Sequence, residues 1–207
     1  MAPYVDLRDD NFFPSWRNLP LATDTHSCFL AEIQECDGFL RYRTIVRDHE
    51  GADSVVAFYP DSYDDGFDFK QLRRGRTLAI MNALPHQFLD GTHGVRVEDM
   101  DDVCVFPIGL QALRELSHDV AWYAVDSQSE QWKCHGCETS KPTGQMSRCG
   151  ECKVYSYCSK ECQAKGWTDK KHKSTCKVMR GPNFLSLLKF DFSSSGPDSN
   201  PLTFQRR

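Results

Sequence analysis

Residues 134–176 read CHGCETSKPTGQMSRCGECKVYSYCSKECQAKGWTDKKHKSTC and hold seven of the ten cysteines of this 207-residue chain. The residues able to bind metal come in four close pairs: Cys134 and Cys137, Cys149 and Cys152, Cys158 and Cys162, His172 and Cys176. Zinc prefers four thiolate or imidazole ligands in tetrahedral geometry, and a two-residue gap lets a tight turn aim two sulfurs at one ion. The spacing therefore predicts zinc binding.

Eight ligands divide into two tetrahedral sites, one with four cysteines and one with three cysteines and a histidine. The last two pairs have members four residues apart, which suits helices because such positions share a face. Spacing alone leaves open which pairs share an ion, and His135, inside the first pair, is an alternative ligand. Four protein ligands leave no open position for water, so two structural zinc ions are predicted.

The string YCSKECQ at 157–163, Trp167 and HKSTC at 172–176 resemble the MYND-type zinc finger, over about Cys134–Cys176. The resemblance implies interleaved sites. One zinc ion is then held by Cys134, Cys137, Cys158 and Cys162, and the other by Cys149, Cys152, His172 and Cys176. The gap between Cys162 and His172 is longer than the commoner gap of the family, and we expect Gly166 with Lys170 and Lys171 to occupy the extra turn.

The same resemblance implies a function, because MYND fingers bind short proline-containing peptides beside the helix that carries the third ligand pair. Two family positions match here, Gln163 and Trp167, which are neighbours on one helical face. An exposed indole suits a proline ring, and a glutamine amide can bond an extended backbone. The alternative is that Trp167 only packs over the zinc core.

Charge divides the chain into two parts. Segment 132–180 has eleven lysines and arginines against four acidic residues, a balance of +7, whereas segment 1–131 has eleven against twenty-three, a balance of −12. Seven zinc-bound thiolates and two Zn²⁺ ions lower the net charge of segment 132–180 to about +4. A lysine-rich face exposed to solvent explains this charge, and a nucleic-acid ligand is not required. Two such different compositions predict two domains.

Composition is that of a soluble globular protein, with 40% hydrophobic and 26% charged residues. No apolar run approaches the ~20 residues of a membrane span, and the N-terminus MAPYVDLRDD lacks the features of a secretory signal. Clustered cysteines without such a signal favour metal chemistry in a reducing compartment. We expect an intracellular protein, in the nucleus or the cytoplasm, with no membrane partner.

The acidic part reads as a run of strands. Apolar or alternating segments at 28–34, 40–47, 54–59, 77–83 and 95–106 have the composition and period of strands. A short helical piece at 67–74, stopped by Gly75, lies between the third and fourth, a Gly/His/Pro loop is expected at 84–94, and a helix with an apolar face follows Pro107. Five strands in this order resemble the oligonucleotide/oligosaccharide-binding (OB) barrel, in order and length only.

The predicted fold class is α+β: a small five-stranded OB-like β-barrel followed by a two-zinc interleaved finger with short helices. The predicted divisions are a lead-in at 1–25, the barrel at 26–118, a linker at 119–131, the finger at 132–178, and an apolar segment with a disordered tail at 179–207. The tail contains SSSGPDSNP, residues 193–201.

The sequence thus predicts a non-enzymatic adaptor whose finger recruits a protein partner. SET-domain methyltransferases also contain MYND fingers, but only 31 residues follow Cys176, too few for a catalytic half. The alternative function is single-stranded nucleic-acid binding by the barrel, through aromatic and basic side chains. These are Tyr42, Phe58 and Tyr59 with Arg41, Arg43 and Arg47 on one strand, and Arg73, Arg74 and Arg76 near the helix end. The negative balance of that domain opposes phosphates.

Overall fold

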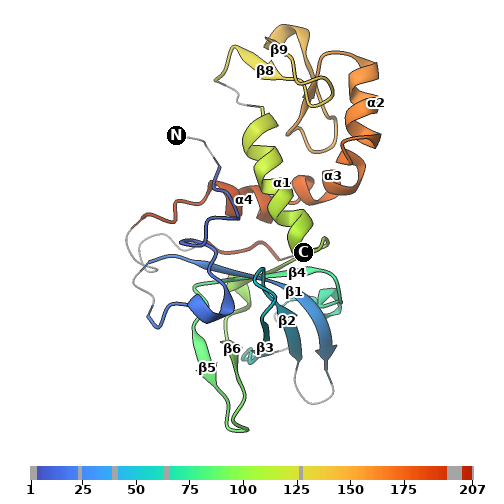
Figure 1. The fold of residues 1–207 in the computed structure, drawn as a ribbon. Coiled ribbons are helices and arrows are strands. Elements are labelled where there is room, and N and C mark those ends of the chain that lie inside the picture. Colours follow the sequence, from blue (N-terminus) through green and yellow to red (C-terminus); the bar gives the residue numbers. More distant parts are fainter. Residues whose placement is uncertain are drawn as a thin grey trace. The chain divides into compact units, whose positions relative to one another are not determined.

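The computed structural model describes residues 4–22, 25–38, 42–62, 66–125, 128–194 and 202–206 (Figure 1). The chain forms two compact units, which we call the sheet unit and the finger unit. The sheet unit is Leu7–Arg114 with Phe190–Arg207, and the finger unit is Met1–Asp6 with Glu115–Lys189. Within the described residues, no helix is long and apolar enough to cross a membrane.

The sheet unit is built on seven strands in the order β5-β6-β3-β2-β1-β4-β7. These strands are β1 (Cys28–Asp37), β2 (Arg43–Arg47), β3 (Asp53–Phe58), β4 (Thr77–Met81), β5 (Pro85–Gln87), β6 (His93–Val97) and β7 (Val103–Phe106). Neighbouring strands are antiparallel, except that β3 and β6 run parallel. Three short 3₁₀ helices, η1 (Trp16–Asn18), η2 (Phe69–Gln71) and η3 (Met100–Asp102), complete it.

The sheet is strongly curled. In a flat sheet β4 and β5 would lie five strand spacings apart, about 24 Å. They are joined by the three residues Asn82–Leu84, which span at most about 14 Å from one strand end to the next. Asn82 has a φ of 50° in the left-handed region, and its backbone N–H donates to the carbonyl oxygen of Ser27 at 2.7 Å. The chain therefore bends sharply between the two strands, and the sheet folds over its own core.

The predicted α+β class is confirmed, but the sheet has seven strands instead of five and does not close into a barrel. Hydrogen bonding leaves the ladder open at β5 and β7, and the region expected as a loop at 84–94 contains β5 and starts β6. A three-residue strand that begins with Pro85 has no period of two to detect, which is why the sequence did not reveal it. The helix expected at 67–74 shrinks to η2, although Gly75 does take a φ of 78°.

Alternating side chains of the strands form one apolar core. Phe29, Ile33, Val46, Phe58 and Leu78 are all at most 1% exposed. The C-terminal residues 202–206 also belong to this unit: the backbone N–H of Phe204 donates to the carbonyl oxygen of Asp101 at 2.8 Å, and its ring is buried. Of the segment expected to be disordered, residues 195–201 lie outside the described residues.

The finger unit consists of short elements around two knuckle loops. Its elements are the strands β8 (Gln131–Lys133), β9 (Ser140–Pro142), β10 (Ser147–Arg148) and β11 (Ser156–Tyr157), the 3₁₀ helix η4 (Thr143–Gln145), and the helices α2 (Lys160–Thr168), α3 (His172–Arg180) and α4 (Pro182–Lys189). Helix α1 (Leu110–Tyr123) contributes its second half. The apolar segment predicted near Phe184 is helix α4, which buries Phe184, Leu187 and Leu188. With so little regular structure, this unit depends on its metal ligands.

Candidate metal centres

Two clusters of metal-ligating side chains lie in the finger unit. We call Cys134, Cys137, Cys158 and Cys162 the first site, and Cys149, Cys152, His172 and Cys176 the second site. Within each cluster the ligand atoms all lie within 4.8 Å of one another. The structure therefore brings together all eight residues expected as ligands, in the interleaved grouping that the resemblance implied.

The sulfur positions suit zinc. A tetrahedral ion with Zn–S bonds of about 2.3 Å separates its sulfurs by about 3.8 Å. In the first site the Sγ of Cys158 lies 3.6 Å from that of Cys137 and 3.5 Å from that of Cys162. In the second site the Sγ atoms of Cys149 and Cys176 are 3.9 Å apart. Both donor sets are complete with four protein ligands, so each zinc ion is structural.

Each knuckle is shaped by a left-handed residue after its second cysteine. Glu138 has a φ of 67°, and its N–H donates to the carbonyl oxygen of Cys134 at 2.8 Å. Lys153 has the same role in the second knuckle: its φ is 58°, and its N–H donates to the carbonyl oxygen of Cys149 at 3.0 Å. These turns hold the two sulfurs of each pair on one side of the loop. Gly136 is needed because a Cβ there would lie 2.3 Å from the carbonyl oxygen of Cys162.

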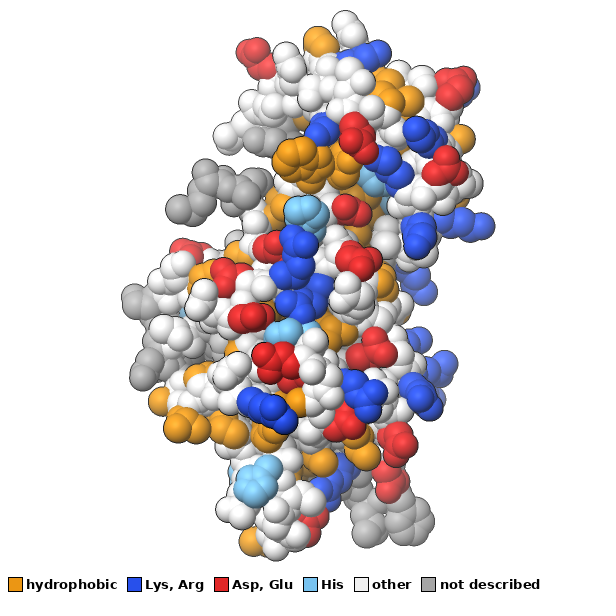
Figure 2. All heavy atoms as spheres, in the orientation of Figure 1, with side chains coloured by type: hydrophobic (Ala, Val, Ile, Leu, Met, Phe, Trp, Pro, Cys, Tyr) orange, Lys and Arg blue, Asp and Glu red, His pale blue; other side chains and the backbone are white. Residues whose placement is uncertain are grey.

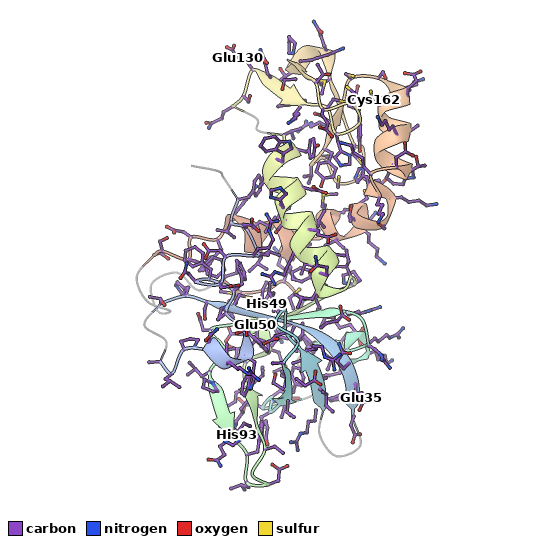
Figure 3. All side chains as sticks on the ribbon, viewed as in Figure 1. Glu35, His49, Glu50, His93, Glu130 and Cys162 are labelled. Carbon is purple, nitrogen blue, oxygen red and sulfur yellow. The ribbon has the colours of Figure 1, made fainter. Side chains whose placement is uncertain are left out.

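Helices α2 and α3 present the other ligand pairs. The side chain of Ser159 accepts a hydrogen bond from the N–H of Cys162 at 3.2 Å and so caps α2, on which Figure 3 labels Cys162. Helix α3 begins at His172 and places Cys176 one turn later. The long gap between Cys162 and His172 differs from the expectation in one respect. Gly166 lies inside α2 and not in a turn, while Lys170 and Lys171 lie between α2 and α3. A Cβ on Gly166 would meet Tyr157 at 2.5 Å, so this glycine allows the helix to approach the knuckle.

His172 is held from both sides of its ring. Its Nε2 lies 3.3 Å from the Sγ of Cys152, and its Nδ1 lies 2.5 Å from the hydroxyl of Tyr157. Burial lowers the pKa of His172 to about 4, so the ring is neutral near pH 7, as a zinc ligand must be. Burial also raises the pKa of Tyr157. With Nε2 on the metal, the proton sits on Nδ1 and is donated to the Tyr157 oxygen.

The two sites differ in exposure. All four ligands of the second site are buried, whereas in the first site Cys137 is exposed and two further ligands are half-buried. The hydroxyl and backbone N–H of Thr139 lower the pKa of Cys137 to about 6. The first site is therefore the one that solvent and reagents reach, and Cys137 is its most accessible thiolate.

His135, the alternative ligand, belongs to neither cluster. It is 1% exposed, and its ring stacks on Tyr155 with centroids 4.1 Å apart and meets Tyr123 edge-on. Burial lowers its pKa to about 4. Among the described residues, its Nδ1 finds no hydrogen-bond partner. His135 is therefore a packing residue between α1 and the second knuckle.

The two residues predicted to bind peptide lie on α2. Gln163 is exposed. Trp167 is half-buried, and its ring meets that of His172 edge-on at 5.2 Å. The contact with His172 accounts for the buried part of Trp167, and peptide binding at Gln163 and Trp167 stays a prediction. Sequence reasoning missed Tyr157 as the partner of His172, although the tyrosine before Cys158 stood in the motif.

The side chains expected to bind nucleic acid are mostly engaged. Arg43 pairs with Asp90 at 3.0 Å and Arg47 with Asp53 at 2.7 Å, while Arg41 lies outside the described residues. The aromatic residues lie with the core: Phe58 is fully buried, and Tyr42 stacks on Phe69 at 4.2 Å. Tyr59 is half-buried under Arg96, whose guanidinium lies 4.4 Å from the ring centre.

Comparison with known proteins identifies the second part of the chain. The MYND finger family model matches residues 134–176. No curated protein sequence matches the chain. Among solved structures, it is similar to a replication protein A heterotrimer bound to ssDNA, with 8% identity and a TM-score of 0.30 over 45% of this chain and 66% of that one. It is also similar to Schizosaccharomyces pombe Pot1pC bound to ssDNA, with 5% identity and a TM-score of 0.34 over 50% of this chain and 93% of that one. On the spacing, the two ligand clusters and the family match, residues 134–176 resemble a MYND finger and hold two structural zinc sites.

Proposed function

We propose that this chain is a non-enzymatic adaptor whose finger recruits a protein partner by binding a short proline-containing peptide at Gln163 and Trp167. One observation carries the proposal: Trp167 is fixed against His172 at 5.2 Å yet keeps part of its indole exposed. A half-buried indole is held in one orientation, so a proline ring can stack on it at little cost in side-chain entropy. The exposed Gln163, one turn earlier on α2, supplies amide donors and acceptors for an extended backbone.

The zinc ions have a structural part in this proposal. Four protein ligands at each ion leave no position for a substrate or an activated water, so the chemistry of the sites is that of a scaffold. Reduced thiols that hold zinc also favour a location inside the cell. The second hypothesis, single-stranded nucleic-acid binding, we do not advance. Stacking needs exposed rings, and Tyr42 and Phe58 pack with the core.

The test is an affinity capture with the full zinc-loaded chain and its Trp167→Ala variant. The matched control is Trp122→Ala, because Trp122 lies in the same unit and is 61% exposed. Captured partners should be lost with Trp167→Ala and kept with Trp122→Ala, since removing a central aromatic anchor costs ~2 kcal/mol or more, roughly thirtyfold in affinity. Both variants must still contain two zinc ions. Partners that survive Trp167→Ala, or that contain no proline segment able to bind alone, would refute the proposal.

A further inference from the structure

Five exposed lysines lie on α2, on α3 or between these two helices, and none of them has an acidic partner among the described residues. They are Lys160, Lys165, Lys171, Lys173 and Lys177. Three other cations of this unit are engaged: Lys170 pairs with Glu138, Arg180 pairs with Glu151, and Lys133 lies over the ring of Trp122. Figure 2 shows Lys and Arg side chains along the edge of the finger unit where α2 and α3 lie.

Three of these lysines lie near Trp167 or its contact residue His172 along the chain. Lys160 is seven residues before Trp167 on α2, so both side chains share one face of the helix, about 10 Å apart along its axis. Lys171 and Lys173 flank His172, and the ring of Trp167 packs against His172. We call Lys160, Lys171 and Lys173 the flanking lysines. Along the chain they put basic side chains both before and after the half-buried indole.

Folding of the helices does not account for these cations. Lys160 and Lys173 stand in the first turns of α2 and α3, where the helix dipole disfavours positive side chains. The two acidic residues nearby are otherwise used. Asp169 accepts a hydrogen bond from the hydroxyl of Thr168 at 2.8 Å, and the carboxylate of Glu161 bonds at the start of α2, where its pKa is lowered by a backbone N–H and Ser159. Neither carboxylate forms an ion pair with a flanking lysine among the described residues, so the lysines are available to an acidic partner.

We infer that the peptide recruited at Trp167 carries acidic residues on both sides of its proline, and that the flanking lysines select them. The inference rests on the function proposed above and adds the chemical class of its ligand. Carboxylates near exposed lysines gain modest attraction, which steers association and sets the orientation of the peptide more than it adds to affinity. A polyanion such as single-stranded nucleic acid is disfavoured, because it needs several exposed rings for stacking and this surface offers Trp167 alone among the described residues of α2 and α3.

The experiment selects peptides from a displayed library of short sequences that share one fixed proline. The baits are the full zinc-loaded chain, a variant with Lys160→Gln, Lys171→Gln and Lys173→Gln, and the control Lys141→Gln. Lys141 lies in β9, away from the connection between α2 and α3 (Figure 1). Glutamine and lysine have similar helix propensities, so the variant helices should form, and zinc content checks this.

Peptides selected by the chain and by the control should be enriched in Asp and Glu beside the proline, and those selected by the triple variant should not. A selected peptide should bind the chain about two- to fivefold more tightly than its Glu→Gln version at low ionic strength, with a smaller ratio at high salt. Trp167-dependent peptides without acidic enrichment would overturn the inference and leave the proposed function standing. Recovery of no peptide, or of peptides indifferent to Trp167→Ala, would overturn the proposed function itself. Displacement of a selected peptide by an equal concentration of single-stranded oligonucleotide would overturn the inference in favour of a polyanion.

Discussion

Replacing Tyr157 by phenylalanine removes one hydroxyl from the second site without removing a ligand. That hydroxyl lies 2.5 Å from His172 Nδ1 and orients the ring so that Nε2 points toward Cys152. Loss of such a partner typically weakens metal binding about 10- to 100-fold, which corresponds to about 1.4–2.7 kcal/mol. The buried Nδ1–H would also be left without an acceptor, and that penalty is of the same size, about 1–3 kcal/mol. We therefore expect Tyr157→Phe to lower the zinc affinity of the second site by this amount and to leave the first site unchanged.

Native mass spectrometry during a chelator titration measures this effect, because it counts the zinc ions that remain on each chain. The wild type should lose its ions at higher chelator concentrations than Tyr157→Phe, whose second-site ion should leave early and singly. Tyr155→Phe is the matched control: Tyr155 is equally buried, but its hydroxyl makes no hydrogen bond among the described residues. An equal loss in the two variants, or joint loss of both ions from Tyr157→Phe, would refute the assigned role of the hydroxyl.

Three further predictions concern the metals and the folded state. N-ethylmaleimide should label the exposed Cys137 long before the buried Cys149, as peptide mass mapping over time would show; the reverse order would contradict the exposure of the first site. Burial holds the pKa of His135 at about 4, below its ordinary value of 6.5, so the unfolded chain binds this proton at a higher pH than the folded chain does. The stability that the neutral ring contributes is therefore complete above about pH 6.5 and is lost as the pH falls toward 4. The pH profile of unfolding should therefore be flatter over this range for His135→Phe, whereas an unchanged slope would argue against it. Chelation should abolish the folding of the finger unit and leave β-type circular dichroism from the sheet unit, while a melt destroyed completely by chelator would contradict an independent apolar core.

The sequence revealed the metal centres more fully than the fold. Ligand spacing is a local property, because two residues between cysteines are what a knuckle turn requires, and this made all eight ligands visible. The division into two interleaved sites is a long-range property, and it came from the resemblance. Strand β5 and the curl of the sheet were invisible because they depend on Asn82 and on pairing between distant strands. The lack of an ion pair at the flanking lysines was equally invisible, because it depends on the positions of acidic side chains in the folded chain.

Helix α2 shows how two structural metal sites support the recruiting surface proposed above. The nine-residue helix is too short to be stable alone in water. Its first turn is fixed by Cys162 in the first site, and its last turn is fixed where Trp167 meets His172 of the second site. The two zinc ions thus hold opposite ends of the helix, and Gln163 lies between them on a rigid support. In the proposed function, a peptide that binds this face does not have to order a loop, because zinc coordination has already ordered the helix.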